Sequence, residues 1–593
     1  MARPRLPIVA HLSPEEVVRR YKACRDGREK THWQVVWLPT RSPEPPTPAA
    51  VAVQVGLTPA WVRTRLVPLL AGESSAATRS RMAAAAARVG VRDAAARVAG
   101  LVTALLPPPP DAAPQPADPK RDEPYVPPAL DALGHVHLVG VGGAGMSAVA
   151  TLLAARGLPV SGSDAADGPA LAGLRRAGVE VHVGHDAAHV AGAGTVVVSS
   201  AVRETNPELA AARAAGLRVL HRSQALAALM AGRDAVAVAG AHGKTTTSAM
   251  VASALLAAGR GPAFAIGGVV VGPDGPLGGA RDGAGPFVAE ADESDGSFLN
   301  YAPLVAIVTN VEPDHLDHYG TRQAFEDAFA RFAARIRPGG LLVACADDEG
   351  AVRLVARVRE QLRRSGVAVT TYGRSPDADV RVGPTTRGPD GSWTTPVVAA
   401  EGSAELRLAV PGEHNGLNAA AAWVALRRLS VPDGAAAEGL AAFRGTGRRF
   451  EDRGRAGGVR VLDDYAHHPT EIAALLRAAR QVTEGRVVVL FQPHLYSRTK
   501  AFADEFATAL AAADEVVVTD VYAAREDPDP TVTGALITDR MGTHARFVAD
   551  RLEAARVVAA LARPGDLVLT VGAGDVTALA PVVLEALGGG GSS

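Results

Sequence analysis

Two glycine-rich loops, each between an apolar stretch and a helix-like stretch, constrain the fold of this chain more than any other feature. Residues 135–164 read HVHLVGVGGAGMSAVATLLAARGLPVSGSD, which is the order strand, glycine loop, helix, strand, acidic residue. Residues 235–250 read AVAVAGAHGKTTTSAM, which begins the same order again. Short apolar strands that alternate with helices are typical of parallel sheets covered on both faces. Both loops therefore predict α/β domains.

The same alternation continues to the end of the chain and predicts three successive α/β domains. Further strands are expected to start near 286, 305 and 340, and then near 458, 485, 514 and 565. Residues 383–412 read as hairpin material. We interpret the first and third domains as Rossmann-like and the second as similar to phosphate-loop ATPases. The expected segments are a small all-α module at 1–106, a Pro-rich linker at 107–130, and α/β domains at 131–232, 233–442 and 443–590.

Composition limits where such a chain can work. The net charge is −1, and Cys24 and Cys345 are the two cysteines, so a disulfide framework is excluded and a reducing compartment fits. No uncharged apolar run reaches about 18 residues, and no signal peptide is recognised at the start. We therefore expect a soluble, cytoplasmic protein without a membrane partner.

The N-terminal module differs in charge from the rest of the chain. Residues 1–106 hold 16 Lys and Arg against 7 Asp and Glu, a net charge of +9. Residues 48–70 predict a helix, a turn and a second helix that carries Trp61, Arg63 and Arg65. This pattern is similar to the N-terminal region of transposases that bind insertion-sequence ends. A helix-turn-helix pattern with arginines is often only a small helical bundle, and that is the simpler explanation here, so we expect no nucleic-acid partner except through this module.

The second loop has the composition of a phosphate-binding loop. Gly240 to Thr245 read GAHGKT, a residue pair shorter than the usual G-x-x-x-x-G-K-[ST] spacing. Glycines let backbone amides turn toward phosphate oxygens, and the following helix N-terminus adds partial positive charge. Lys244 would reach the β- and γ-phosphates of ATP, and Thr245 would offer its hydroxyl to Mg²⁺.

Acidic residues follow two strands of the second domain. Residues 290–295 supply Glu290, Asp292, Glu293 and Asp295, and residues 312–318 supply a second group with His315 and His318. Carboxyl ends of strands in an open α/β sheet face the ligand crevice, and Mg²⁺ prefers hard oxygen ligands. The two clusters are therefore candidate metal ligands behind the phosphate loop.

Eight motifs identify a family to which this sequence bears a close resemblance. They occur in the order GVGGAGMS, GAHGKTTT, EADESDGSFL, TNVEPDHLDHYG, VPGEHNGLNAAAA, FRGTGRRFE, DDYAHHPTEI and FQPHLYSRT. They closely resemble the motifs of the Mur ligases over about residues 134–585. Within that family they are most similar to the members that use ATP to join L-alanine to UDP-N-acetylmuramate. The resemblance implies that the first loop holds the diphosphate of a UDP-sugar instead of NAD.

The resemblance also implies roles for individual residues. The UDP-sugar would contact Gly140, Gly142, Gly143, Ala144, Gly145, Met146, Ser147, Asp164, Ser199 and Ser200. ATP would contact Gly240, Ala241, His242, Gly243, Lys244, Thr245, Thr246, His414, Asn415, Asn418 and Arg448. Thr245, Glu290 and His315 would hold the metal, and Tyr465, His467 and Arg498 would bind the amino acid. The catalytic residues would be Lys244, His315, Arg449 and His468.

Several interpretations stay open at this point. His467 and His468 precede Pro469 and could simply cap the helix that follows, and Arg498 could lie on a helix surface. Ala241 stands where relatives often have Thr, and Leu495 where others carry Arg. The rival functions are a recycling ligase that attaches the L-Ala-D-Glu-diaminopimelate tripeptide to the same UDP-sugar, an NAD-dependent oxidoreductase, and a DNA-binding regulator with a degenerate ligase body.

Overall fold

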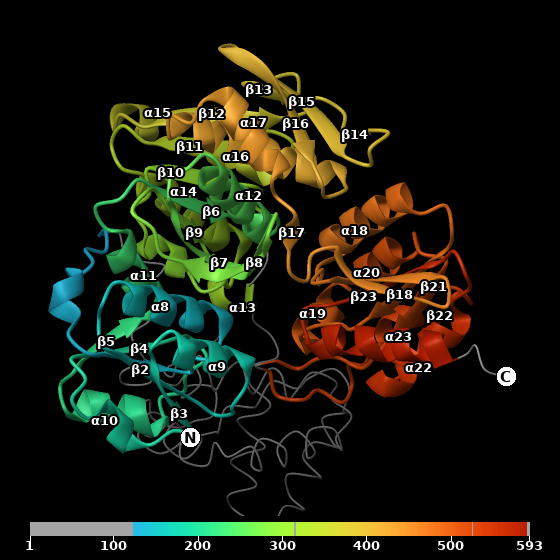
Figure 1. The fold of residues 1–593 in the computed structure, drawn as a ribbon, viewed down its shortest axis with the longest axis horizontal. Coiled ribbons are helices and arrows are strands. Elements are labelled where there is room, and N and C mark those ends of the chain that lie inside the picture. The colour runs from blue at the N-terminus through green and yellow to red at the C-terminus, as the bar shows by residue number, and fades with distance from the viewer. Residues whose placement is uncertain (1–122, 313–315, 525, 590–593) are drawn as a thin grey trace, which may run out of the picture. The chain divides into compact units, whose positions relative to one another are not determined.

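The computed structural model describes residues 123–312, 316–524 and 526–589. These residues form three sheets that follow one another along the chain (Figure 1). The expectation of successive α/β units is therefore confirmed for this part of the chain. The predictions for the module at 1–106 and for His315 fall outside the described residues.

The first sheet has five parallel strands in the order β3-β2-β1-β4-β5. The strands are β1 (Val136–Val139), β2 (Val160–Asp164), β3 (Glu180–Val183), β4 (Thr195–Val198) and β5 (Arg218–His221). Helices α8 (Ala144–Ala155), α9 (Pro169–Arg176) and α11 (Arg222–Met230) pack on one face, and α10 (Pro207–Ala214) packs on the other. The chain order reverses at β1, so the first glycine loop opens at the crevice where such sheets bind ligands.

The central sheet contains twelve strands, of which seven are parallel in the order β13-β12-β11-β10-β6-β9-β7. These strands are β6 (Ala235–Ala239), β7 (Ala263–Gly272), β9 (Phe287–Glu290), β10 (Val305–Val308), β11 (Leu341–Cys345), β12 (Ala368–Gly373) and β13 (Val380–Val382). Strand β6 lies between β9 and β10. The phosphate loop after β6 is therefore flanked by the ends of the two strands that carry the acidic clusters.

Antiparallel strands extend both edges of the central sheet. β14 (Thr386–Arg387), β15 (Trp393–Ala399) and β16 (Gly402–Leu408) form the expected hairpin region at one edge. At the other edge, β8 (Gly275–Arg281) and the two-residue β17 (Gly445–Thr446) both pair with β7. β17 thus belongs to the central sheet, although residue 443 begins the third segment in the sequence interpretation.

Helices cover both faces of the central sheet. One face carries α12 (Lys244–Ala257), α16 (Glu413–Arg428) and α17 (Asp433–Ala441), and the other carries α14 (Arg322–Ala334) and α15 (Glu349–Arg364). The short α13 (Leu316–Tyr319) precedes α14. Four consecutive alanines of α16, at 419–422, are fully buried and let this helix approach α12 closely. This alanine-rich stretch therefore belongs to the packed core and not to the surface.

The third sheet has the order β18-β19-β23-β20-β21-β22, with all strands parallel except β18. The strands are β18 (Glu451–Ala456), β19 (Val459–Asp464), β20 (Val487–Phe491), β21 (Glu515–Val518), β22 (Ala545–Phe547) and β23 (Leu567–Val571). Helices α18 (Pro469–Val482), α20 (Ala503–Leu510) and α21 (Ala535–Thr538) pack on one face, and α22 (Arg551–Leu561) and α23 (Leu579–Gly589) on the other. The short α19 (Tyr496–Ala501) follows β20.

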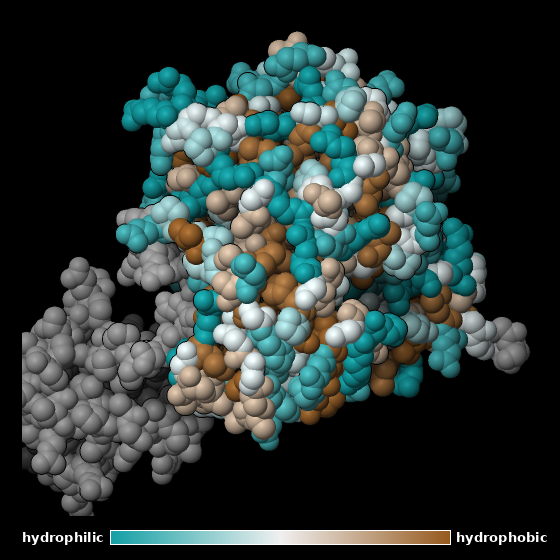
Figure 2. All heavy atoms as spheres, turned by 60° about the vertical axis from the view of Figure 1, so that its left-hand side comes forward, coloured by the Kyte–Doolittle hydropathy of each residue, from teal (hydrophilic) through white to brown (hydrophobic). Residues whose placement is uncertain are grey.

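The surface of the described residues mixes polar and apolar side chains. On the face drawn in Figure 2, hydrophilic and hydrophobic residues alternate in small patches. Within the described ranges, no helix combines the length and the apolar character that crossing a bilayer requires.

Candidate active site

The first glycine loop ends in a helix N-terminus whose amides have no side-chain cap. Gly143 is the N-cap of α8 and provides no side-chain hydrogen bond, so the first turn leaves N–H groups for a ligand. Gly140 has φ +76°, and a Cβ on Gly142 would lie 2.8 Å from Leu171 Cδ1. The Gly142 N–H donates to Asp164 Oδ2 at 2.8 Å. Asp164 therefore braces the loop itself. The side chain of Met146 is buried in the core, so only its backbone is placed to contact a ligand.

Arg222 brings positive charge to the same helix N-terminus. A Cβ on Gly145 would lie 2.2 Å from Arg222 Nη1, so the guanidinium passes directly over this glycine. Arg222 Nη2 lies 3.2 Å from Asp292 Oδ2, and Ser200 donates a hydrogen bond to Asp295. These contacts connect the first sheet to the acidic segment after β9. Arg222 was not predicted from the sequence, because no motif marks it.

The phosphate loop is held in a tight conformation by glycine. Gly243, at φ +81°, is the N-cap of α12, and a Cβ on Gly240 would lie 2.2 Å from Thr309 Oγ1. Lys244 Nζ donates to the carbonyl oxygens of Gly240 and Ala241 at 2.6 and 3.2 Å. The lysine is thus anchored to its own loop at the start of the helix.

Glu293 is the charge partner of Lys244. Lys244 Nζ lies 2.9 Å from Glu293 Oε1, and the Glu293 side chain is buried. Burial raises the pKa of Glu293 to about 7, although the lysine opposes this. Burial alone would lower the pKa of Lys244, but the nearby carboxylates of Glu293 and Glu290 raise it. Lys244 therefore stays charged in a site where Glu293 titrates near neutral pH.

Thr245 and Glu290 offer adjacent hard oxygen atoms. Thr245 Oγ1 lies 3.0 and 3.1 Å from the two carboxylate oxygens of Glu290, and Glu290 Oε2 also accepts from the Gly267 N–H at 2.8 Å. A hydroxyl and a carboxylate converging beside a phosphate loop match the oxygen ligands that Mg²⁺ takes. These two residues therefore fit the predicted metal site, while its third member, His315, lies outside the described residues.

Glu471 joins the phosphate loop to the third sheet. Its Oε1 lies 3.5 Å from His242 Nδ1 and 3.3 Å from Arg449 Nη1, and its Oε2 accepts from the His467 N–H at 2.9 Å. His242 Nε2 lies 3.2 Å from Glu312 Oε2. Burial would lower the pKa of His242, but hydrogen bonds to Glu312 and Glu471 raise it to about 9. Glu471 was absent from the predicted site, although its place three residues after His468 fits a helix-capping pattern.

Arg448 and Arg449 lie in a short segment, residues 447–450, that connects β17 to β18. Arg448 and Phe450 have φ +60° and +51°, which side-chain-bearing residues rarely adopt. Arg448 Nη2 donates to the carbonyl oxygens of Gly572 and Gly574 at 2.7 and 3.1 Å. Arg448 is therefore partly engaged with the third sheet, whereas Arg449 points to Glu471. The Phe450 N–H donates to Asp464 Oδ2 at 2.7 Å, and burial raises the pKa of Asp464 to about 6.

The predicted amino-acid segment lies beside this connection. The guanidinium carbons of Arg448 and Arg449 lie 4.8 and 5.1 Å from the ring centre of Tyr465. His467 Nδ1 lies 3.0 Å from the carbonyl oxygen of Tyr465 and 3.2 Å from Glu471 Oε2. Because both partners are acceptors, Nδ1 carries the proton and Nε2 is the free acceptor. Burial lowers the pKa of His467 to about 3, so the ring is neutral.

The structure bears on two interpretations that the sequence left open, namely helix capping by the histidines and a surface position for Arg498. His468 is the N-cap of α18 and is buried, and Glu471 accepts from its N–H at 3.3 Å. The capping interpretation therefore holds for His468, which does not line the main cleft. Arg498 is only 5% exposed, so it is not a surface residue. Leu495, at φ +71°, is buried and precedes α19 in a conformation that is strained for leucine.

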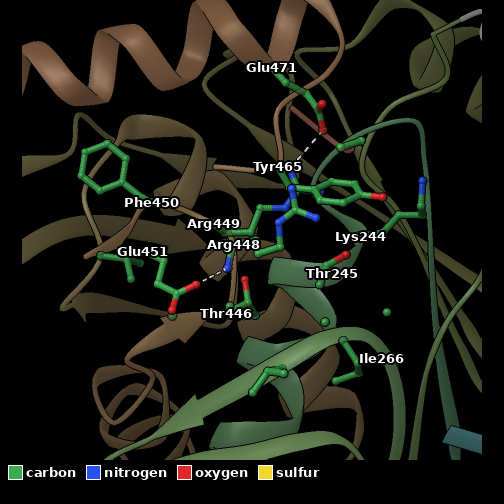
Figure 3. Close-up of a pocket in the computed structure, with 18 of the residues that line it drawn as sticks. Lys244, Thr245, Ile266, Thr446, Arg448, Arg449, Phe450, Glu451, Tyr465 and Glu471 are labelled. Atoms are coloured by element: carbon green, nitrogen blue, oxygen red, sulfur yellow. Dashed lines mark hydrogen bonds and ion pairs between the residues drawn. The ribbon is translucent and has the colours of Figure 1, made fainter. Parts of the chain in front are cut away.

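One cleft of about 1420 Å³ connects these groups. Figure 3 labels Lys244, Thr245, Arg449 and Tyr465 in its wall. The lining residues come from the segments around all three sheets: Ala144, Ser147, Lys244, Thr245, Glu290, Asp292, Glu293, Arg449, Tyr465, His467, Leu495 and Arg498. A second cavity of about 270 Å³ adjoins the phosphate loop. It is lined by predicted ATP contacts, namely His242, Gly243, Thr245, Thr246, His414, Asn415 and Asn418. Ser199, Ser200 and Asp164 line neither space.

Comparisons with known proteins identify the family of the chain. Three family models match in succession: the Mur ligase family catalytic domain at 135–234, the Mur ligase middle domain at 238–426, and the Mur ligase glutamate ligase domain at 448–574. The chain is 62% identical over 464 residues to the UDP-N-acetylmuramate–L-alanine ligase of Kineococcus radiotolerans, covering 77% of this chain and 96% of that one. It is 54% identical over 462 residues to the ligase of the same name from Paenarthrobacter aurescens, covering 78% and 98%.

Solved structures give the same result. The UDP-N-acetylmuramate–alanine ligase of Thermotoga maritima matches with a TM-score of 0.64 and 32% identity, over 76% of this chain and 98% of that chain. A murein peptide ligase of Psychrobacter arcticus matches with a TM-score of 0.58 and 26% identity, over 77% and 99%. The family models and the relatives, which agree with the three sheets of the structure, show that this chain belongs to the Mur ligase family.

Proposed function

We propose that this protein is an ATP-dependent ligase that joins L-alanine to the lactyl carboxylate of UDP-N-acetylmuramate, forming UDP-N-acetylmuramoyl-L-alanine, ADP and phosphate in peptidoglycan precursor synthesis. Two relatives that match this chain over nearly their whole length are named as ligases for UDP-N-acetylmuramate and L-alanine. The family membership and those names support the activity, and the site residues below belong to the proposal.

The observation that carries the proposal is the single cleft that connects the two loops. Ala144 and Ser147 of the first helix and Lys244 and Thr245 of the second line the same space. A diphosphate at one helix N-terminus and a triphosphate at the other would point a linked carboxylate toward the γ-phosphate. An oxidoreductase that binds NAD at the first loop would leave the second loop without a role.

In the first step, a carboxylate oxygen of the acceptor attacks the γ-phosphorus of ATP. The bond from that phosphorus to the β–γ bridging oxygen breaks, ADP leaves, and an acyl phosphate forms. Such a transfer needs positioning and neutralisation of negative charge more than covalent help. Lys244 provides charge from the phosphate loop, and Arg449 provides it from the opposite wall. Mg²⁺, held by Thr245, Glu290 and the proposed ligand His315, would neutralise phosphate charge when bound.

In the second step, the amine of L-alanine attacks the acyl carbon. A carbon–nitrogen bond forms, the bond from the acyl carbon to the phosphate oxygen breaks, phosphate leaves, and the nitrogen gives up a proton to solvent or phosphate. His467 Nε2 is an acceptor on a neutral ring and is suited to orient the amine. Arg498, in the same cleft wall, would bind the alanine carboxylate.

The test is phosphate release by the purified chain. ATP, Mg²⁺ and UDP-N-acetylmuramate are supplied with L-alanine, with no amino acid, or with L-Ala-D-Glu-diaminopimelate. The proposal predicts release that requires L-alanine, together with a product heavier by one alanine residue in mass spectrometry. Release only with the tripeptide would establish the recycling activity instead, and no release from folded protein would overturn both assignments.

A further inference from the structure

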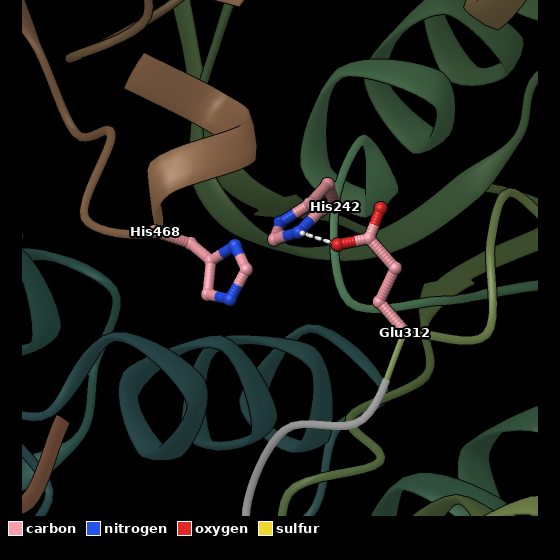
Figure 4. Close-up of side chains that lie close together, drawn as sticks. All are labelled: His242, Glu312 and His468. Atoms are coloured by element: carbon pink, nitrogen blue, oxygen red, sulfur yellow. Dashed lines mark hydrogen bonds and ion pairs between the residues drawn. The ribbon is translucent and has the colours of Figure 1, made fainter. Parts of the chain in front are cut away.

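Three side chains outside the proposed Mg²⁺ ligands form a compact donor set, called here the His242–Glu312–His468 cluster (Figure 4). One ligand atom from each residue lies within 4.8 Å of the others. His242 Nε2 lies 3.2 Å from Glu312 Oε2, and the rings of His242 and His468 have centroids 4.8 Å apart. His468 is buried, and His242 and Glu312 are partly buried.

Other residues orient this donor set in the way that metal ligands are usually oriented. The second ring nitrogen of His242, Nδ1, lies 3.5 Å from Glu471 Oε1. A carboxylate behind a histidine fixes the ring and leaves Nε2 to face a metal. Thr470 Oγ1 donates to Glu312 Oε2 at 3.1 Å, which fixes the carboxylate. Helix α18 fixes His468, which is its N-cap. The three donors are therefore positioned by separate contacts.

The chemistry of the donors selects the kind of ion. Two imidazoles and one carboxylate suit Zn²⁺ and similar transition metals, whereas Mg²⁺ prefers oxygen ligands. We propose that the His242–Glu312–His468 cluster is a binding site for a transition-metal dication such as Zn²⁺, separate from the oxygen site at Thr245 and Glu290. The metal would take the position between His242 Nε2 and Glu312 Oε2, with the proton now on that nitrogen released to solvent.

Metal at this site would act against nucleotide binding. His242 belongs to the phosphate loop, and His242, Glu312, Thr470 and Glu471 all line the second cavity together with the predicted ATP contacts. His468, in contrast, belongs to the third segment. A metal would therefore tie the phosphate loop to the start of α18 beside the cavity that the predicted ATP contacts line. This antagonism rests on the ATP assignment in the proposed function, but the metal site does not.

The experiment measures metal binding on the whole chain without turnover. The protein is stripped with a chelator and kept in excess Mg²⁺, which occupies oxygen sites. Co²⁺ is then titrated and followed by its visible absorption, and Zn²⁺ is titrated by calorimetry. Two variants each remove one ligand with little change of shape. Glu312→Gln keeps the acceptor for Thr470, and His468→Asn keeps a residue that caps helices well. His544→Asn, at a histidine that lines neither the cleft nor the second cavity, is the matched control.

We expect one Co²⁺ per chain, displaced by Zn²⁺, with affinity lowered roughly tenfold or more in Glu312→Gln and His468→Asn and unchanged in His544→Asn. Circular dichroism checks that each variant is folded. Failure of the wild-type chain to bind Co²⁺ below millimolar concentration would overturn the site. Equal binding by wild type and both ligand variants would also overturn it.

A second measurement tests the antagonism separately. A non-hydrolysable ATP analogue is titrated in excess Mg²⁺ with and without Zn²⁺. We expect Zn²⁺ to weaken nucleotide binding to the wild-type chain. Nucleotide binding to Glu312→Gln should be the same with and without Zn²⁺, and this variant controls for chelation of Zn²⁺ by the nucleotide. Equal nucleotide affinity with and without bound Zn²⁺ would overturn the antagonism. The metal titrations do not depend on turnover, so a chain without ligase activity would overturn the proposed function but not the metal site.

Discussion

At the residue scale, Lys244 shows how hydrogen bonds and a buried carboxylate hold a positive charge in place inside the cleft. Its ammonium donates to two carbonyl oxygens of its own loop and to Glu293, so protein groups supply every contact the structure gives it. A γ-phosphate would offer more negative charge than Glu293, whose pKa is raised to about 7 by burial. Protonation of Glu293 would then release the lysine to the nucleotide without leaving a buried charge unpaired.

Replacing Lys244 with alanine is expected to abolish turnover without unfolding the chain. Loss of one preorganised charge at a phosphoryl-transfer site costs roughly 10²–10³-fold or more in kcat. The fold is expected to survive because Glu293 can take up a proton when its partner is removed. Phosphate release and thermal unfolding test the two statements. Lys500→Ala, at an exposed lysine, should behave like the wild type in both. Near-normal turnover of Lys244→Ala would contradict the role assigned to the lysine.

Glu208 predicts a dependence of stability on pH at the same scale. The side chain is fully buried and accepts from Ser163 Oγ at 2.6 Å, His189 Nδ1 at 2.7 Å and His185 Nδ1 at 2.9 Å. Burial would raise its pKa, but these bonds and His137 lower it to about 2. Because the folded pKa lies below the unfolded value of 4.5, the ionised carboxylate stabilises the fold above pH 4.5. That stability is lost as pH falls toward 2.

Glu208→Gln should therefore destabilise the first sheet by about 3 kcal/mol at pH 7, with a difference that shrinks as pH falls below 4.5. Hydrogen exchange of the β1 and β2 amides measures this locally. Glu204→Gln is the control, because Glu204 pairs with Arg213 near the surface and should contribute little. A pH-independent difference between Glu208→Gln and the wild type would show that the carboxylate charge is not the source.

At the scale of elements, the site depends on where strands end. β1 and β6 each lead into a glycine loop and a helix, and each lies between two parallel neighbours. The strand ends that flank β6 carry Glu290 on one side and Glu312 on the other. Acidic residues that are distant in sequence therefore lie on both sides of the phosphate loop, where Glu290 contacts Thr245 and Glu312 contacts His242. The alternation of strands and helices predicts that these strand ends face the loop, and the metal-binding role of the acids stays a prediction.

The first loop allows an element-scale prediction about substrate binding. A Cβ on Gly142 would meet Leu171 Cδ1 at 2.8 Å and Asp164 Oδ2 at 2.9 Å, so Gly142→Ala must displace the loop from the N-terminus of α8. Overpacking of this kind costs about 1–3 kcal/mol. We expect the KM for UDP-N-acetylmuramate to rise roughly tenfold, with the KM for ATP nearly unchanged. Gly168→Ala is the control, because a Cβ there meets nothing within 4 Å. An equal rise in both KM values would contradict a local effect.

Sequence reasoning reached the elements and the phosphate chemistry but missed contacts that only the fold creates. Lys244, Thr245 and Glu290 carry local signatures, and the structure brings them together. Arg222 carries none, and Glu471 carries only its capping spacing after His468, because the contacts of both depend on packing between segments far apart in the chain. The same reason applies to His468, whose position as the N-cap of α18 is seen only in the fold, while its catalytic role stays a prediction. Arg448 and Arg449 are equivalent in sequence, and their backbone conformations separate them.

At the scale of the whole molecule, the segments built around the three sheets each contribute residues to the cleft. The first supplies Ala144 and Ser147, the central one supplies Lys244 and Glu290, and the third supplies Tyr465 and Arg498. Phosphoryl transfer requires that groups from these walls contact one nucleotide and one acceptor at the same time. A cleft of about 1420 Å³ leaves room for both substrates and for closure around them.

We therefore expect the substrates to change the relation between the central and third segments. A non-hydrolysable ATP analogue together with UDP-N-acetylmuramate should reduce the radius of gyration in solution scattering. Either ligand alone should produce a smaller change, because each fills only part of the cleft. Identical scattering profiles with and without both ligands would count against closure.

The short connection between β17 and β18 has a consequence for how such proteins can recombine. Thr446 is paired with β7 of the central sheet, while Arg448 and Phe450 are bonded to residues of the third segment, at Tyr465 and Asp464. Arg449 lies between these two anchors. A crossover within residues 447–450 would join halves that no longer hold this arginine in register. Modules from related ligases should therefore be interchangeable only when the break precedes β17, so that the donor brings β17, the connection and the arginine together.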